Sequence, residues 1–149
     1  MTKRAEPNAA VEAICESHGD RPAALLEILH DVQGLLGYVP EPTLPTIAKR
    51  LNIARAEVHG VVSFYHDFRT EPPPPVVVKL CRAEACQAMG VGRLANEVAA
   101  KLSGDERVVV EPVYCLGNCA LAPAALVNGR LMGRLSVERL LTAVREASA

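Results

Sequence analysis

The sequence lacks a surplus of charge of either sign. Its 149 residues include 16 Lys and Arg against 17 Asp and Glu, which gives a formal net charge of -1. A chain without a strong positive field attracts phosphate groups weakly, so general nucleic-acid binding is disfavoured. We therefore expect no nucleic-acid partner, and we expect any protein partner to be recognised by shape.

Long hydrophobic runs are also missing. The first 20 residues contain no continuous apolar core of the kind found in signal peptides. No stretch approaches the roughly 20 apolar residues that a membrane-spanning helix needs. These absences predict a cytoplasmic protein with no membrane span. In a reducing compartment the five cysteines favour metal ligation or thiol chemistry over disulfides.

Motifs for nucleotide binding and hydrolysis are absent as well. No Gly-x-Gly-x-x-Gly follows a strand pattern, and no Walker loop or Ser/His/Asp arrangement is found. The chain has no Cys-x-x-Cys pair, which disfavours a dithiol redox centre. No catalytic residue is therefore assigned, and the chain is not expected to bind NAD by itself.

What the sequence does contain falls into two halves around four consecutive prolines, residues 72–75. Prolines remove backbone donors and hold an extended conformation, so this run is interpreted as a linker. Residues 1–71 carry apolar side chains at helical spacing, with Asp20 as a candidate N-cap. The pattern predicts an N-terminal helical bundle, and its apolar positions include Val11, Ile14, Cys15, Leu25, Leu26, Ile28, Leu29, Val32, Leu44, Ile47, Ala48 and Leu51.

Residues 76–149 change to short β-branched runs. Strands are predicted at Val76–Leu80 and Arg107–Val110, on either side of a helix at Val91–Leu102. Asn128-Gly129 suits a type I′ turn between two further short strands, and Ser136 can cap a last helix. A βαβ unit followed by a hairpin and a helix predicts a thioredoxin-like α/β domain, so the fold class is α+β.

Four cysteines lie in two loops that follow the two predicted strands. Cys81 and Cys86 come after the first strand, and Cys115 and Cys119 come after the second. If these strands are parallel neighbours, both loops leave the same edge of the sheet and the four thiols converge. Four thiolates are the ligands of a 2Fe-2S cluster, and spacers of four and three residues suit it better than a tight zinc knuckle.

The loops also suit an anionic centre. Gly117, Gly90 and Gly92 permit positive φ, which lets backbone N–H groups point at sulfur. Cys86 is expected just ahead of a helix N-terminus, where a thiolate is favoured. Four apolar residues are expected to keep water off the centre, namely Met89, Leu116, Leu121 and Pro123.

Other interpretations of these features stay open from the residues alone. The four cysteines could hold zinc instead of iron and sulfide. Cys15 is interpreted as a small buried hydrophobe of the first helix. The histidines share no ligand spacing, so surface or capping roles are expected for His18, His30, His59 and His66.

Two features of the first half concern partners. Residues 47–58 follow a helix-turn-helix pattern, which would suggest a zinc-stabilised DNA-binding protein, but the second helix lacks the residues that read bases. Packing within the bundle is the better interpretation. Four of the five aromatic residues gather in this half, where they either anchor an interface or fill the core, namely Tyr38, Phe64, Tyr65 and Phe68.

Three segments resemble a known family. They are residues 78–86 with residues 111–123 around the cysteines, and residues 36–40 and 58–68 in the helical half. The sequence is similar to the thioredoxin-like 2Fe-2S ferredoxins, and more narrowly to the 24 kDa subunit of respiratory complex I and its relatives. Those relatives belong to NAD-dependent formate dehydrogenases and bidirectional hydrogenases, and the resemblance covers almost the whole chain.

The resemblance implies that Cys81, Cys86, Cys115 and Cys119 ligate one 2Fe-2S cluster. It implies that the helical half docks against a beta subunit, an iron-sulfur flavoprotein that binds FMN and NAD, with which single electrons are exchanged. Residues 81–90 resemble most the gamma subunit of a soluble formate dehydrogenase whose molybdenum lies in another subunit. Complex I and a bidirectional hydrogenase are the alternatives.

Overall fold

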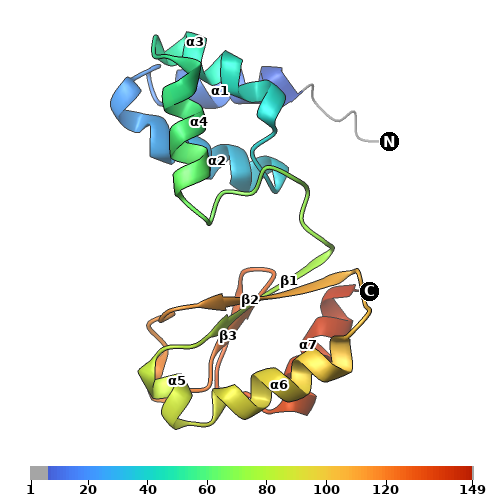
Figure 1. Ribbon diagram of the computed structural model, residues 1–149. Coiled ribbons are helices and arrows are strands. Elements are labelled where there is room, and N and C mark those ends of the chain that lie inside the picture. Colours follow the sequence, from blue (N-terminus) through green and yellow to red (C-terminus); the bar gives the residue numbers. More distant parts are fainter. Residues whose placement is uncertain (1–6, 149) are drawn as a thin grey trace. The chain divides into compact units, whose positions relative to one another are not determined.

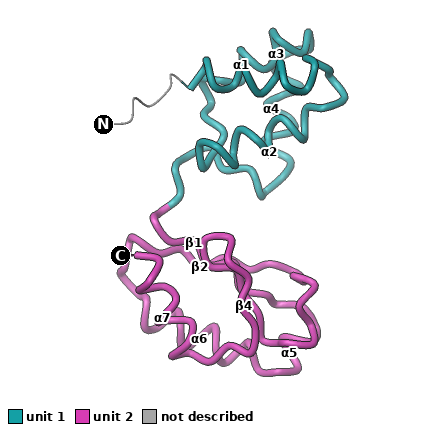
Figure 2. The backbone as a smooth tube through the Cα atoms, turned by 180° about the vertical axis from the view of Figure 1, so that it is seen from behind, with its two compact units in different colours: residues 1–73 teal, residues 74–149 magenta. Residues whose placement is uncertain are grey.

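The computed structural model describes residues 7–148, which form two compact units. The first unit comprises the described residues up to 73, and the second comprises those from 74 onward (Figure 2). The boundary falls inside the proline run. Within the described residues no helix is long and apolar enough to cross a membrane.

Four helices build the first unit, as the apolar spacing predicts. They are α1 (Pro7–Ser17), α2 (Leu25–Leu36), α3 (Leu44–Leu51) and α4 (Arg55–Phe64), with 3₁₀ turns at Pro22–Ala24 and Glu41–Thr43. Each α-helix turns one face inward, because its apolar residues recur every three or four positions. The fully buried residues of this core include Val11, Ile28, Val32, Ile47 and Val58.

The ends of these helices show where sequence patterns are weak. Asn52 ends α3 in the left-handed conformation at φ 52°, inside the helix-turn-helix pattern of residues 47–58. Gly37 ends α2 in the same way at φ 84°. Asp20 is not an N-cap: it has φ 51°, and its carboxylate binds the Arg50 guanidinium through two hydrogen bonds of 2.9 and 2.7 Å. Asp20 therefore forms a tertiary ion pair with Arg50 instead of capping a helix.

The second unit is a four-stranded sheet with order β2-β1-β3-β4, covered on one face by helices (Figure 1). Strands β1 (Val76–Cys81) and β2 (Val108–Val113) are parallel, and they are joined by α6 (Val91–Leu102). Strand β3 (Ala125–Val127) runs antiparallel to β1 and to β4 (Arg130–Met132). Helix α7 (Val137–Ser148) packs beside α6 on β1 and β3. The predicted α+β class, with a thioredoxin-like second half, is confirmed.

Local chemistry closes the hairpin and starts the last helix as predicted. Asn128 and Gly129 have φ values of 46° and 81°, which a type I′ turn requires. The Asn128 side chain also accepts the Val77 N–H at 2.8 Å and donates to the Pro75 carbonyl at 3.0 Å. The Ser136 hydroxyl accepts the Arg139 N–H at 3.3 Å, so it caps α7.

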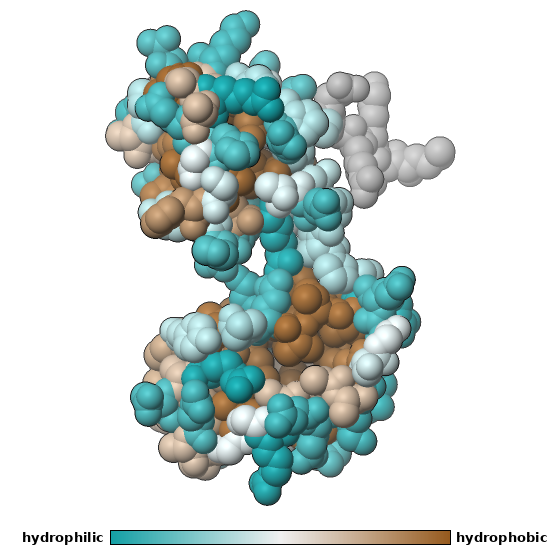
Figure 3. Space-filling view, in the orientation of Figure 1, coloured by the Kyte–Doolittle hydropathy of each residue, from teal (hydrophilic) through white to brown (hydrophobic). Residues whose placement is uncertain are grey.

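The two faces of the sheet differ. The face under α6 and α7 buries Val76, Val78 and Leu80, which alternate along β1. Residues between them remain half-buried, among them Val77 and its partner Val109. Figure 3 shows hydrophobic residues gathered over β1 and β2. The unit therefore has one fully formed core and one sheet face that is only partly covered.

Candidate metal centre

The parallel register brings the two cysteine loops to one edge of the sheet. Cys81 is the last residue of β1 and lies opposite Val113, the last residue of β2. Cys115 follows Val113 by two positions, so both chains leave the sheet at the same level. The Arg82 N–H bonds the Val113 carbonyl at 2.8 Å, which fixes the start of the first loop against the second. This convergence is the one that the sequence predicts.

Two short helical segments carry the remaining cysteines. Cys86 lies within α5 (Glu84–Ala88), not just ahead of a helix as predicted, because the chain turns into a five-residue helix before α6 begins. Cys119 opens a 3₁₀ turn at Cys119–Leu121. This turn packs against α5. Residues from both loops therefore meet away from the strands as well as at their ends.

The four sulfurs form an inner and an outer pair. Cys81 and Cys86 are each 2% exposed, and their thiols interact directly. Cys115 and Cys119 are exposed, with 3.8 Å between their sulfur atoms. All four are free cysteines, and negative charge on Cys81 would raise the pKa of both Cys86 and Cys119. The arrangement offers two thiols from each loop.

Backbone N–H groups point at these sulfurs. Burial alone would raise the pKa of Cys81, but N–H groups of Ala83, Cys115 and Leu116, together with the Cys86 thiol, lower that pKa. The Gly117 N–H lies 3.4 Å from the Cys115 sulfur. Such donors stabilise negative charge on sulfur. The predicted role of Gly117 is thus seen, at a φ of 73°.

One cysteine of each pair holds its proton more firmly than a free thiol does. Burial, followed by the interaction with Cys81, raises the pKa of Cys86. The hydrogen bond with Cys115 raises the pKa of Cys119. Both shifts favour the protonated thiol, so metal ligation must displace a proton from Cys86 and from Cys119.

The donor set fits a 2Fe-2S cluster. Four thiols, with amide donors directed at sulfur, are the ligands and hydrogen bonds that such clusters use. Within residues 7–148 no three His, Cys, Asp or Glu side chains converge as they would around a single metal ion. The four cysteines instead stand as two pairs, one from each loop.

Strand β4 and its continuation hold the second loop in place. The Arg134 N–H bonds the Leu121 carbonyl at 2.6 Å, and the Leu135 N–H bonds the Pro123 carbonyl at 3.1 Å. Gly133 lies against the same loop, where a Cβ atom would come within 2.7 Å of the Leu121 carbonyl oxygen. Sequence patterns contain no sign of this role for Gly133, because it appears only when the hairpin and loop are packed together.

The predicted apolar cover is present only in part. Pro123 is buried and Leu116 packs on the core. Met89 and Leu121 are 62% and 39% exposed, and Tyr114, next to Cys115, is 75% exposed. Two of the four residues expected as cover are therefore exposed themselves and do not form a buried lid.

Predicted residues outside the centre behave in different ways. Cys15 is fully buried in the first unit, as expected of a core residue. The His18 ring bonds Asp31 at 2.7 Å, and the His30 ring packs on Phe68. In the helix-turn-helix pattern, α4 buries Val58 and Val62 in the bundle core.

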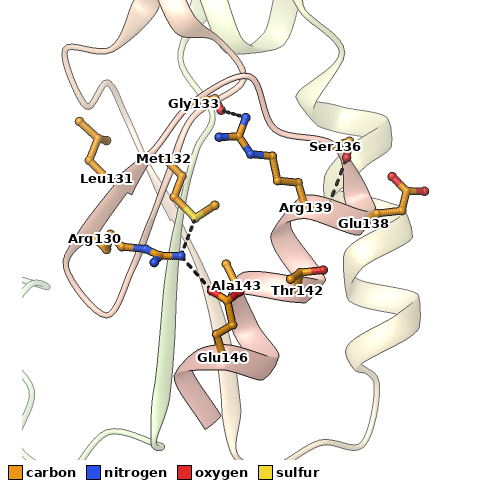
Figure 4. A pocket seen from close by; sticks show the side chains of 10 residues that line it. All are labelled: Arg130, Leu131, Met132, Gly133, Ser136, Glu138, Arg139, Thr142, Ala143 and Glu146. Carbon is orange, nitrogen blue, oxygen red and sulfur yellow. Dashed lines mark hydrogen bonds and ion pairs between the residues drawn. The ribbon is translucent and has the colours of Figure 1, made fainter. Parts of the chain in front are cut away.

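A surface pocket of about 670 Å³ lies between β4 and α7, and it contains none of the cysteines (Figure 4). Its two arginines are engaged within the fold. Arg139 donates to the Gly133 and Arg134 carbonyls at 3.0 and 3.3 Å, and Arg130 pairs with Glu146 at 3.4 Å. These bonds fasten the hairpin to α7.

The family follows from comparison with known proteins. A model described as thioredoxin-like [2Fe-2S] ferredoxin matches residues 11–148. The chain belongs to this family. The resemblance seen in the sequence is thereby confirmed, and for this thioredoxin-like [2Fe-2S] ferredoxin the cofactor is a 2Fe-2S cluster.

Relatives of this ferredoxin include components of two kinds of complex. The NADP-reducing hydrogenase subunit HndA of Solidesulfovibrio fructosivorans is 28% identical over 128 residues, which are 81% of this chain and 75% of HndA. An NADH-quinone oxidoreductase subunit of Pseudomonas aeruginosa is 30% identical over 126 residues, 80% of this chain and 76% of that subunit. The subunit of the same name from Aquifex aeolicus is 31% identical over 112 residues, 70% of each chain.

Solved structures agree with this fold. A chain of the NAD+-reducing [NiFe]-hydrogenase in the H2-reduced state superposes with a TM-score of 0.71 at 27% identity. The match covers 84% of this ferredoxin and 22% of the hydrogenase chain. This ferredoxin therefore corresponds to about a fifth of that longer chain.

Proposed function

We propose that this chain is the electron-transfer subunit of an NAD-linked oxidoreductase, with Cys81, Cys86, Cys115 and Cys119 as the cluster ligands. It exchanges single electrons with the FMN of a partner flavoprotein subunit that also binds NAD(H). The observation that carries the proposal is the convergence of four free thiols at one sheet edge, with backbone N–H groups aimed at two of the sulfurs.

The residues of this chain have distinct tasks in that function. A bound 2Fe-2S cluster accepts and releases one electron at a time. The inner thiols anchor it beneath the sheet edge, and the amides of Ala83 and Gly117 stabilise negative charge on sulfur. The outer thiols stand at the surface, where they shorten the distance to a partner.

The parent complex is proposed to be a soluble, molybdenum-containing, NAD-dependent formate dehydrogenase in the cytoplasm, with this chain as its gamma subunit. Residues 81–90, Cys-Arg-Ala-Glu-Ala-Cys-Gln-Ala-Met-Gly, resemble that subunit most. Formate oxidation would occur on the molybdenum-containing subunit. Residues 1–71 would dock on the beta flavoprotein.

The second candidate is the equivalent component of complex I or of an NAD-linked hydrogenase. The similarity to subunits of NADH-quinone oxidoreductase and to HndA supports it. Both candidates share the same role for this chain. They differ in what supplies electrons to the flavoprotein.

The cluster is tested first on the chain purified without air. Iron and sulfide analysis should give two of each per chain, and low-temperature EPR should show a spin-half signal only after dithionite reduction. One zinc per chain and no signal would contradict the proposal.

The parent complex is tested on the complex purified through a tag on this chain. Formate, NADH and H₂ are added separately, and the EPR signal of the cluster is followed. Reduction by formate as well as NADH supports the formate dehydrogenase. Reduction by NADH and H₂ only, or by NADH only, assigns the chain to a hydrogenase or to complex I.

A further inference from the structure

One buried donor beside the cysteine site has no partner among the described residues. The Nε atom of Arg82 is enclosed by the protein and forms no hydrogen bond. Buried polar groups in proteins are almost always hydrogen-bonded, so each exception needs a physical reason such as an ion or a redox role. The position of Arg82 next to Cys81 provides such a reason.

Arg82 occupies a fixed place at the centre. It directly follows Cys81, and its own N–H bonds the Val113 carbonyl at 2.8 Å. Its carbonyl accepts the Gln87 side-chain amide at 2.9 Å. Adjacent Cα atoms are 3.8 Å apart, an arginine guanidinium carbon lies at most about 6 Å from its Cα and a cysteine sulfur about 3 Å from its own, so the charge stays within roughly 13 Å of the Cys81 sulfur.

The charge of Arg82 is not neutralised by an acidic side chain of the described residues. A guanidinium remains protonated in proteins, and none of the ion pairs among residues 7–148 includes Arg82. Glu84, the nearest acid in the sequence, is exposed on α5 and does not pair with it. A half-buried cation without an anion is costly, so an anionic group nearby stabilises it.

We propose that Arg82 is the counter-cation of the bound cluster and raises its reduction potential. This proposal depends on the ligand set given above. Four thiolates and two sulfides leave a 2Fe-2S centre with net negative charge, and reduction adds one more electron. A fixed positive charge beside Cys81 stabilises the reduced centre more than the oxidised one. Arg82 thus tunes the centre without ligating it.

The test compares the reduction potentials of three variants of the full chain with that of the wild type. R82Q and R82M remove the charge, R82K keeps it, and the potentials are measured by EPR-monitored redox titration. R82Q and R82M should disfavour reduction about tenfold, which is about 59 mV for one electron. R82K should stay near the wild type. The matched control is R93Q, because Arg93 lies on α6 with a side chain 87% exposed, and its potential should not move.

Each outcome decides the proposal. Unchanged potentials in cluster-containing R82Q or R82M overturn it. If the neutral variants lose the cluster while R82K retains it, the charge is what the centre requires and the proposal stands. Loss of the cluster in all three shows that Arg82 serves the fold, which overturns the proposal. A wild-type chain without two irons and two sulfides instead refutes the ligand assignment.

Discussion

Gly133 lies so close to Leu121 that a Cβ atom built on it would be 2.7 Å from both the Leu121 Cβ and the Leu121 carbonyl oxygen. The neighbouring Asn118 amide would be 2.8 Å away. Leu121 ends the turn that Cys119 begins. The absence of one methyl group at Gly133 therefore decides where the outer cysteine loop sits.

The first prediction is that G133A displaces this loop. A backbone carbonyl cannot move aside as a flexible side chain can, so we expect the variant to lose roughly 1–3 kcal/mol of stability and to hold its cluster less firmly. Iron content after dialysis and the rate of bleaching in air measure the effect. G104A is the control, because Gly104 has positive φ but nothing lies within 4 Å of its Cβ position. Equal iron retention in both variants would refute a special role for Gly133.

The second prediction concerns the ligands. C86S and C119A should lose the EPR signal and most of the iron, because each leaves one iron short of a thiolate. C15A should keep two irons per chain, since Cys15 is buried in the other unit. C15A should lower only the free energy of unfolding, by about 1 kcal/mol, because it removes buried side-chain volume. Full iron content in either ligand variant would remove that residue from the ligand set.

The third prediction is a pH dependence at Asp105. Side-chain and backbone hydrogen bonds from Arg107 lower the pKa of Asp105 to about 2. Because the folded-state pKa lies below the unfolded value near 3.8, this stabilisation is complete above about pH 5. It is lost as the pH falls toward 2.

Urea unfolding of wild type and D105N measures this difference at several pH values. The wild type should be the more stable at pH 6, and the two curves should converge toward pH 2. Loss of the cluster in acid affects both chains alike, so their difference isolates Asp105. E106Q, at the next position, is the control and should show no such convergence. A wild-type advantage that is as large at pH 2 as at pH 6 would contradict the assignment.

The fourth prediction tests docking through the first unit. Phe64 is 72% exposed at the end of α4 and packs edge-on against Tyr65, whereas Phe68 is 7% exposed. The predicted aromatic group therefore divides into a surface part and a core part. F64S should reduce co-purification of the flavoprotein while leaving the melting temperature near that of the wild type. F68L should lower the melting temperature. L131S, an exposed apolar substitution in the second unit, is the control. Unimpaired flavoprotein recovery with F64S would argue against docking through this surface.

Much of the fold could be predicted because its patterns are local. The alternation in β1, the helical spacing of α6 and the Asn128-Gly129 turn all depend on residues close in sequence. Helix caps were less predictable, since Asp20 binds Arg50 thirty positions away. Helix α5 was missed because five residues are too few to show a period.

The centre shows the same division. Each cysteine pair directly follows a predicted strand. If the two strands are parallel neighbours, this position is enough to predict that the two pairs converge. The packing of Gly133 on Leu121 and the buried Nε of Arg82 depend on contacts between distant segments. Local periodicity contains no information about such contacts.

The exposure of Cys115 and Cys119 and the burial of Cys81 and Cys86 make the outer pair the accessible side of the centre. Whatever arrives from solution, whether an iron donor during assembly, an oxidant or an electron-transfer partner, meets Cys115 and Cys119 before it meets Cys81 and Cys86. Cluster assembly, oxidative damage and electron exchange are therefore all expected to take place through the exposed side of the centre. A partner that covers the exposed Tyr114, Met89 and Leu121 would conduct electrons and keep oxygen out with the same contact.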